Sequence, residues 1–399
     1  MKHKLAIVVS HPIQHFVPFY RALAQEPEID LVVIYCSRIG VEPYFDKAMN
    51  TTITWKMDLL GDYEHVFLPE ADSITATGPR SVNNPSVGAE LMKHAPDVVL
   101  IHGYNYITTL LALYWCNRNR VAAMMISDSQ LKPLRLSRTR MIKKLLLPHV
   151  LRRFDAFLTV GDCNREYYLH YGVPRERLFS SPFTIDEPRY VAAQRNRSAL
   201  RSACRAELGI SDNEVMVLTV GKLSRRKRPS DVIEAARAVK AAGNEVNLRF
   251  VLAGNGEEME RLQVLVKREE LPVLLTGFVN VDRLPEHYAA ADILLHPAGI
   301  EPFGLVVPEA CCIGLPLVLS AAVGAIGAKS PARPGENALV FPVGEISAIV
   351  ECVSGLAQAP IKRAQMASRS LEIFNELNMT RSVRGALEGI EFLTQKART

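Results

Sequence analysis

Short apolar runs alternate with amphipathic stretches throughout the first half of the chain. The run Leu5–Val9 has no polar residue, as expected for a strand that is buried on both faces of a parallel sheet. Phe16–Gln25 then repeats apolar residues at helical spacing. Further runs of the strand type are Asp30–Tyr35, Asp97–Ile101, Ala122–Ile126 and Ala156–Val160. This alternation predicts a doubly wound parallel sheet of the α/β class.

The same alternation starts again in the second half. Runs of the strand type are Val215–Val220, Leu248–Ala253, Val273–Thr276, Asp292–Leu295 and Pro316–Ser320. Helical patterns cover Pro229–Ala242, Glu257–Arg268, Ile361–Leu377 and Ser382–Gln395. Between the halves, near 183–212, lies a polar stretch that is rich in Arg and Ser. We therefore expect two Rossmann-like domains, at 1–185 and 186–378, and a C-terminal helix in 379–399 that packs back on the first domain.

Composition excludes several classes of protein. The chain has 399 residues, of which 48% are hydrophobic and 22% charged, as in chains that bury a large core. Its 47 basic and 42 acidic residues leave a net charge of +5, an excess too small to indicate nucleic-acid binding. The seven cysteines include no Cys-x-x-Cys pair, so neither a zinc site nor a disulfide framework is expected. We expect a reducing, cytoplasmic location.

Two segments raise the question of membrane contact. The uncharged run 310–328 is long enough to span a bilayer, but its Gly and Pro residues divide it into a helix end, a buried strand and a loop. The segment 131–154 holds eight basic residues, no acidic one and several leucines, with Pro148 interrupting the pattern. Such a segment suits either the cytoplasmic surface of an inner membrane or a helix packed on the sheet with its basic side solvated. No secretory leader is recognisable, because the first apolar run ends at Val9.

In open α/β sheets ligands bind beyond the carboxyl ends of the strands, so the loops there are the first candidates for a site. The loop 221–228 lies between a predicted strand and a predicted helix and holds five basic residues, including Lys222 and Lys227. A helix N-terminus offers unpaired N–H groups, and lysines beside it suit a diphosphate. The alternative is a basic turn that is merely solvated.

A second candidate is the segment 301–309, which has a glutamate at each end. Pro and Gly between them exclude one continuous helix, so a helix should start near Leu305. Glu301 would then lie on the loop and Glu309 on the first turns of the helix. Paired carboxylates suit a hydroxyl-rich ligand, and the amides of Phe303–Leu305 suit an anionic group. Stabilisation of the helix dipole explains the second glutamate alone but not the first.

Several pieces of the second half stand in an order that is typical of one enzyme family. They are Val220–Leu223 with Lys227, Ala253–Gly256, Gly277–Val279, Tyr288–Asp292, Glu301–Glu309 and Gly335–Pro342. Together they make residues 215–342 resemble glycosyltransferase family 4, whose retaining transferases of the bacterial surface-glycan type have the GT-B fold. The resemblance implies two Rossmann-like domains that face each other across a cleft.

The resemblance also implies a donor site in the second half. Lys222 and Lys227 would contact the diphosphate of a nucleotide sugar, although the family usually has arginine at the position of Lys222. Glu309 would bind the ribose hydroxyls, and Glu301 would bind hydroxyls of the donor sugar. The other implied donor contacts are Gly277 and Phe278 near the base and the backbone of Phe303, Gly304 and Leu305.

The first half resembles the family less closely. His11 and Gln14 follow the first strand, where some members have an acceptor loop, so they are candidates for the acceptor side. His11 equally suits a cap at the strand end. Many members carry a His-Asp pair after the strand here predicted at 122–126, whereas this chain has a serine before Asp128. Asp128 keeps the carboxylate, and His102, one strand over, is the other candidate for a catalytic contact.

The implied reaction is transfer of a hexosyl-type sugar from a nucleotide-diphosphate donor to an acceptor hydroxyl with retention (EC 2.4). Its context would be assembly of a surface polysaccharide or lipopolysaccharide on a glycan or lipid-linked acceptor. Lys227, Glu301, Asp128 and His102 are the candidate catalytic residues. No Asp-x-Asp motif is present to hold a bridging metal, so neither a metal nor a cofactor besides the sugar nucleotide is expected. The alternatives are a nucleotide-sugar epimerase and a non-catalytic partner subunit that binds a sugar nucleotide.

Overall fold

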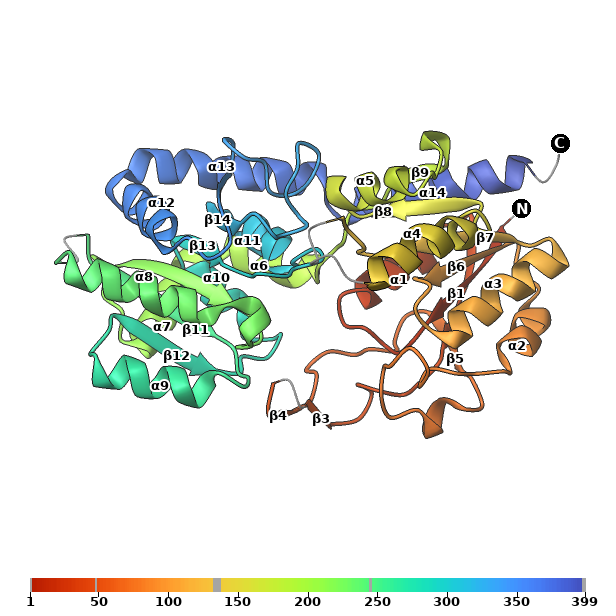
Figure 1. Cartoon of the computed structure of the whole chain (residues 1–399), viewed down its shortest axis with the longest axis horizontal. Coiled ribbons are helices and arrows are strands. Elements are labelled where there is room, and N and C mark those ends of the chain that lie inside the picture. The colour runs from red at the N-terminus through yellow and green to blue at the C-terminus, as the bar shows by residue number, and fades with distance from the viewer. Residues whose placement is uncertain (1, 47–48, 132–137, 244–245, 397–399) are drawn as a thin grey trace. The chain divides into compact units, whose positions relative to one another are not determined.

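The computed structural model describes residues 2–46, 49–131, 138–243 and 246–396. It divides the chain into two compact units, each built around one parallel sheet. The N-terminal unit comprises Met1–Tyr44, Met57–Thr184 and Asn378–Thr399, and the C-terminal unit comprises Phe45–Lys56 and Ile185–Leu377. Both halves therefore have the doubly wound α/β form that the sequence predicts (Figure 1).

The sheet of the N-terminal unit has seven parallel strands in the order β5-β2-β1-β6-β7-β8-β9. These are β1 (His3–Val9), β2 (Ile29–Tyr35), β5 (Glu64–Phe67), β6 (Val98–His102), β7 (Ala122–Ile126), β8 (Ala156–Thr159) and β9 (Leu178–Ser180). A separate two-stranded sheet pairs β3 (Tyr44–Asp46) with β4 (Thr51–Ile53). The chain crosses from one side of β1 to the other at β6, so the loops after these two strands lie at a topological switch point.

Helices cover both faces of this sheet. One face packs against α2 (Val87–His94), α3 (Ile107–Asn119), α4 (Arg138–Leu151) and α5 (Asp162–His170). The other face packs against α14 (Met379–Lys396), which in turn contacts α1 (Val17–Gln25). Short 3-10 turns lie at Ala71–Ser73 and Arg175–Arg177. Because side chains alternate along a strand, Ala6 and Val8 of β1 enter the core on the first face, while its other apolar residues are buried on the second.

Helix α14 carries the end of the chain back onto the N-terminal sheet, where it contacts β8 and β9. Figure 1 shows it in blue near the yellow arrow of β8. A Cβ atom added to Gly385 would lie 1.8 Å from the carbonyl oxygen of Ser180, so only glycine allows this close approach. One turn earlier, Ser382 and Ser181 share a buried hydrogen bond of 2.9 Å between their hydroxyl groups. These contacts fix the helix at one register on β9.

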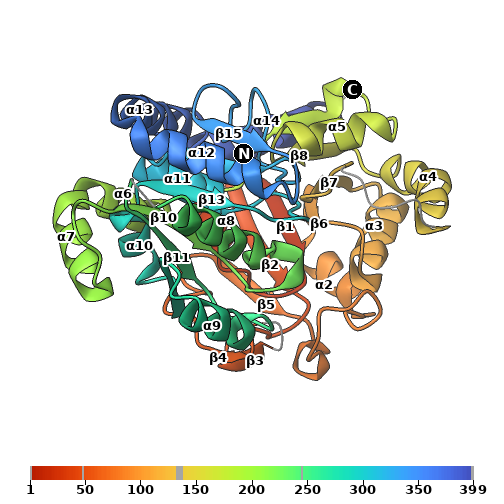
Figure 2. The ribbon, with the colours of Figure 1, turned by 60° about the vertical axis from the view of Figure 1, so that its left-hand side comes forward.

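The sheet of the C-terminal unit has six parallel strands in the order β12-β11-β10-β13-β14-β15. These are β10 (Val215–Val220), β11 (Leu248–Ala253), β12 (Val273–Gly277), β13 (Ile293–His296), β14 (Leu317–Ser320) and β15 (Ala338–Phe341). On one face lie α8 (Pro229–Ala241), α9 (Met259–Arg268) and α12 (Ile346–Gln358) (Figure 2). On the other lie α10 (Leu284–Ala290) and α11 (Val306–Ile313), packed against α6 (Glu187–Arg195), α7 (Arg197–Leu208) and α13 (Pro360–Glu376). The switch point of this sheet lies between β10 and β13.

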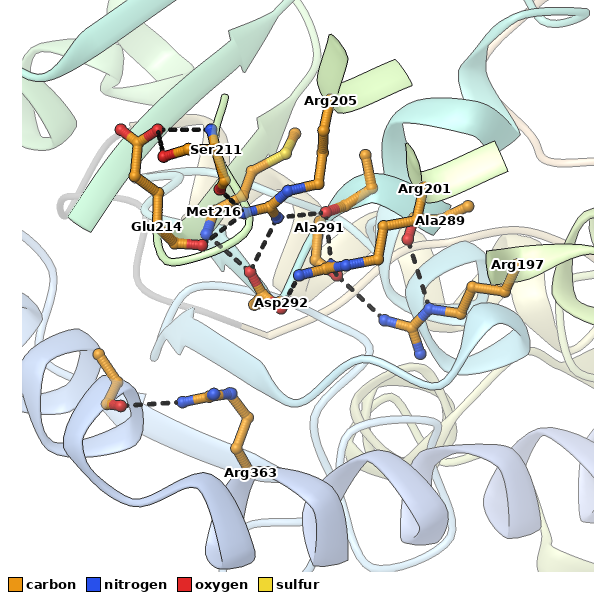
Figure 3. A network of polar contacts seen from close by, with 12 residues as sticks. Arg197, Arg201, Arg205, Ser211, Glu214, Met216, Ala289, Ala291, Asp292 and Arg363 are labelled. Atoms are coloured by element: carbon orange, nitrogen blue, oxygen red, sulfur yellow. Dashed lines mark hydrogen bonds and ion pairs between the residues drawn. The ribbon is translucent and has the colours of Figure 1, made fainter. Parts of the chain in front are cut away.

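The polar stretch near 183–212, which we expected only as a join, is largely helical. Its arginines at 197, 201 and 205 are spaced at one turn along α7 and therefore share one face (Figure 3). They donate hydrogen bonds to the carbonyl oxygens of residues 289–291, where α10 ends. Arg201 and Arg205 also bind the carboxylate of Asp292, at 2.9 and 3.2 Å. The arginines thus hold the segment that leads directly into β13.

The uncharged run 310–328 contains the end of α11, all of β14 and a loop, which confirms that prediction. Among the described residues no helix is long and apolar enough to cross a membrane.

Replacement of Gly385 by alanine should weaken the docking of α14. The added Cβ would overlap backbone on β9, and such overpacking costs about 1–3 kcal/mol. Urea denaturation should show a lower free energy of unfolding for Gly385→Ala. Gly355 is the matched control, because it is also helical and has nothing within 4 Å of its added Cβ. Gly355→Ala should be neutral or stabilising, and equal effects of the two changes would contradict this account.

Candidate active site

The basic loop after β10 lies at the switch point of the C-terminal sheet. It contains a short 3-10 turn at Arg225–Lys227, and α8 begins at Pro229. The carbonyl oxygen of Arg226 accepts a hydrogen bond of 2.9 Å from the N–H of Gly299, in the loop after β13. The two loops on either side of the switch point are therefore joined, and Lys227 lies where they meet.

The Gly254-x-Gly256 motif braces this loop. A Cβ atom at Gly254 would lie 1.9 Å from the carbonyl oxygen of Gly221, and one at Gly256 would lie 2.7 Å from that of Leu223. The N–H of Leu223 donates to the carbonyl oxygen of Asn255 at 2.9 Å. Two loops can touch backbone to backbone only without side chains at these positions. The motif is therefore needed to hold the basic loop in place.

Glu301 lies in the loop after β13 and is the most heavily paired carboxylate of the site. Its carboxylate forms an ion pair with the ammonium of Lys227. It also accepts a hydrogen bond of 2.8 Å from Nε2 of His296, the last residue of β13. Because a carboxylate only accepts, Nε2 is the donor. Burial alone would raise the pKa of Glu301, but the His296 hydrogen bond and the Lys227 charge lower it to about 2. Glu301 is thus a buried, ionised group whose partners include Lys227 and His296.

Glu309 has a different environment from Glu301. The helix α11 begins at Val306 after a turn formed by Phe303, Gly304 and Leu305, as the sequence predicts. On this helix the Glu309 carboxyl accepts a hydrogen bond of 2.5 Å from the hydroxyl of Tyr288, on α10, and another from Tyr190, on α6. Burial raises the pKa of Glu309 to about 7, although both tyrosine hydrogen bonds oppose the shift. This carboxyl therefore gains or loses its proton near neutral pH.

The remaining predicted donor residues are spread around the same end of the sheet. Gly277 ends β12, and Phe278 lines a cavity of about 360 Å³ with Glu207, Asn280 and Arg283. Lys222 does not join Glu301. Its ammonium lies 2.7 Å from the carboxylate of Asp46, on β3.

In the N-terminal unit the predicted acceptor-side residues lie at the carboxyl ends of adjacent strands. His11 and Gln14 follow β1, His102 ends β6 and Asp128 follows β7. Nδ1 of His11 shares a hydrogen bond of 2.9 Å with Ser10. Burial lowers the pKa of His11 to about 4, so its ring is neutral at physiological pH. Asp128 contributes to the raised pKa of Tyr106, a shift that burial dominates.

His102 belongs to a buried aromatic cluster. Its Nε2 shares a hydrogen bond of 3.0 Å with the hydroxyl of Tyr20, and its ring stands edge-on to Phe16 at 4.4 Å between centroids. Burial, followed by the charges of His15 and His11, lowers the pKa of His102 to about 3. A ring in this environment stays neutral. The structure therefore shows a packing role for His102, and its catalytic contact stays a prediction.

The basic segment 131–154 is described only in part. Residues 132–137 lie outside the described residues, and the side-chain descriptions begin again at Lys144. Within α4, Leu147 and Leu151 enter the core, whereas Leu145 and Leu146 are 68% and 60% exposed. The helix thus packs one side on the sheet and leaves a pair of leucines outside.

Three residues of the site were given no role from the sequence: His296, Tyr190 and Tyr288, although Tyr288 begins one of the family-like segments. His296 could have been found, because it is a polar residue that ends a buried strand at the ligand edge of the sheet. The tyrosines could not, because α6 and α10 approach Glu309 only through the tertiary fold. Among the described residues no group of three or more His, Cys, Asp and Glu side chains is placed to hold a metal ion.

Two Rossmann-like units with these parallel sheets define the GT-B fold. Known proteins support this class. Residues 201–372 match the family model described as Glycosyl transferases group 1. HepE of Anabaena, crystallised with UDP and glucose, has a TM-score of 0.72 and 17% identity, covering 98% of this chain and 99% of that one. WaaG, a glycosyltransferase involved in lipopolysaccharide biosynthesis, has a TM-score of 0.62 and 16% identity over 96% and 99%.

Curated relatives match over shorter segments. An uncharacterized glycosyltransferase of Methanocaldococcus jannaschii is 35% identical over 122 residues, which are 30% of each chain. The D-inositol 3-phosphate glycosyltransferase of Geodermatophilus obscurus is 31% identical over 189 residues, 45% of this chain and 40% of that one. The chain therefore spans less than half the length of these two relatives. The matches show that the C-terminal half is similar to glycosyl transferases group 1.

Replacement of Glu309 by glutamine should change how stability depends on pH. The folded chain retains a proton on Glu309 that the unfolded chain releases between about pH 4.5 and 7. The free energy of unfolding should therefore fall as pH rises through this window, by about 2–3 kcal/mol. Glutamine cannot ionise, so Glu309→Gln should melt at a higher temperature than the unmodified protein at pH 8 and at a similar one at pH 5.

The control for this comparison is the exposed Glu28, whose change to glutamine should leave the pH profile of the melting temperature unaltered. A Glu309→Gln variant that melts below the unmodified protein at pH 8 would contradict the raised pKa of the buried Glu309 carboxyl.

Proposed function

We propose that the chain is a retaining glycosyltransferase that moves a sugar from a nucleotide-diphosphate donor to an acceptor hydroxyl. The observation that carries the proposal is the pairing of Lys227 with Glu301 at the switch point of the C-terminal sheet. A cation and a carboxylate side by side suit a ligand that carries a diphosphate next to a polyhydroxylated sugar. The family match over 201–372 supports this reading.

The donor would bind to the C-terminal unit. Lys227 would neutralise the charge that develops on the departing diphosphate. Lys222, whose ammonium is paired with Asp46, would be the second cation of the loop to contact it. Glu301 is ionised and would accept hydrogen bonds from the sugar hydroxyls, and Glu309 would accept them from the ribose. The base would lie near Phe278. HepE, which shares the fold, has been crystallised with UDP and with UDP-glucose, and this supports the assignment of a nucleotide-sugar donor.

The acceptor would bind to the N-terminal unit, at the strand ends that carry His11, Gln14, His102 and Asp128. Retention would follow from attack of the acceptor hydroxyl on the face that the diphosphate leaves, so that the C1–O bond to the acceptor forms as the C1–O bond to the phosphate breaks. The acceptor proton would pass to the departing phosphate oxygen or to Asp128. Because the pKa of His102 is about 3, its neutral ring would be too weak a base to take this proton.

We further propose that the acceptor is a growing surface polysaccharide or a lipid-linked lipopolysaccharide precursor at the cytoplasmic face of a membrane. WaaG and the galactosyltransferase WaaB, both linked to lipopolysaccharide, share the fold. The exposed Leu145 and Leu146 on the basic helix α4 would suit weak contact with that membrane.

A thermal-shift panel tests the donor site. UDP, GDP, ADP and CMP sugars are added without metal, and a ligand that binds the folded chain raises its melting temperature. One nucleotide family should give a clear shift, and Lys227→Ala or Glu309→Ala should abolish it. Arg226→Ala is the matched control, because Arg226 is an exposed cation of the same loop. Loss of the shift in the control, or no shift with any nucleotide sugar, would contradict the donor assignment.

Turnover distinguishes the remaining possibilities. With the shifting donor and a suitable acceptor, Lys227→Ala should lower the rate by at least about a hundredfold, because the leaving group loses its counter-charge. Conversion of the donor to an isomer without any acceptor would instead show an epimerase, and donor binding without turnover would show a binding subunit.

A further inference from the structure

A cavity of the N-terminal unit lies at the edge of its sheet opposite the predicted acceptor residues. It has a volume of about 660 Å³ and is walled by the amino ends of β1 and β7, the segment before β6, and the carboxyl ends of α3 and α14. Both chain ends approach it, since Lys2 and Thr394 line its wall. Parallel strands place His102 and Asp128 at their other ends, so this cavity is separate from the proposed acceptor site.

Four cations line this cavity: Lys2, Arg120, Arg152 and Arg153. Within the described part of the chain none of their side chains makes a hydrogen bond or an ion pair. Two carboxylates also line the cavity, but both are bound to backbone. Asp97 accepts the N–H of Lys4 at 2.8 Å, and Asp155 accepts the N–H of Ala123 at 3.0 Å. The cavity therefore keeps an excess of positive charge with donors that lack a partner.

The attraction of cations to the carboxyl ends of helices explains only part of this cluster. Arg120 caps the carboxyl end of α3, and Arg152 and Arg153 follow α4, where cations are individually favoured. Lys2, however, precedes a strand. Arg120 also has a φ of 58°, in the left-handed region where glycine fits without strain. An arginine thus occupies a position that its backbone disfavours, in the wall that also contains Lys2, Arg152 and Arg153.

We infer that this cavity is a binding site for phosphate groups, separate from the proposed donor site. Guanidinium groups match phosphate oxygens with two parallel hydrogen bonds, and a multiply charged anion relieves the repulsion among the cations. The volume of the cavity is large enough for a diphosphate. The phosphate could belong to a soluble molecule or to the headgroup of a lipid, and the chemistry of recognition is the same.

Calorimetric titration with pyrophosphate tests the soluble source. Lys227→Ala serves as the background, because the proposed donor site would also take pyrophosphate. Binding should persist in this background and weaken at least about tenfold when Arg152 and Arg153 are also changed to alanine. Arg118→Ala is the matched control, since Arg118 is an exposed arginine of α3 outside the cavity. Failure of the proposed function would leave this result unchanged.

Co-sedimentation with vesicles tests the lipid source. The chain should bind phosphatidylglycerol vesicles more than phosphatidylcholine vesicles, and the double change at 152 and 153 should abolish the preference if a headgroup is the natural ligand. Binding of either phosphate source that is lost with the cavity arginines supports the site. Binding of neither, or equal loss in Arg118→Ala, would overturn it.

Arg120→Gly separates binding from folding. Glycine relieves the left-handed backbone, so this variant should melt at the same temperature as the unmodified protein or above it. Its affinity for the phosphate source should nevertheless fall at least about threefold. An unchanged affinity together with an intact fold would remove Arg120 from the site and contradict the inference.

Discussion

A carboxylate buried inside a protein is tolerated only when partners offset the loss of its hydration, and Glu301 is the clearest case in this chain. Two of its partners come from neighbouring strands of the sheet: His296 ends β13, just before the loop of Glu301, and Lys227 lies in the loop after β10. These loops meet because β10 and β13 pair in parallel at the switch point of the sheet. The strand order therefore brings the two charges together.

The surrounding structure holds these two loops in place. Gly254 and Gly256 let the loop after β11 touch the basic loop backbone to backbone. From the other side, the three arginines of α7 bind the end of α10 and Asp292, which leads into β13. Both sets of contacts fix the loops that carry the partners of Glu301. A site for a charged ligand needs such fixed loops if it is to be formed before the ligand arrives.

Much of this arrangement could be predicted from the sequence. Apolar runs located the strands, Pro and Gly between the glutamates located the start of α11, and the loop after β10 stood out by its charge. Local patterns could not reveal that Tyr190 and Tyr288 enclose Glu309, because these residues lie on helices far away in the chain. The sequence indicated only a polar join at the arginines of α7. Their role follows from the fold, because the carbonyl oxygens that they bind belong to the end of α10, far along the chain.

A double-mutant cycle tests the central claim most directly. Lys227→Met, Glu301→Gln and the combined variant are compared by their free energies of unfolding. Each single change leaves the partner charge uncompensated in a buried setting, so the double variant should lose less than the sum of the two, by more than about 1 kcal/mol. Additive losses, within about 0.5 kcal/mol, would show that the two groups do not depend on each other and would contradict the account.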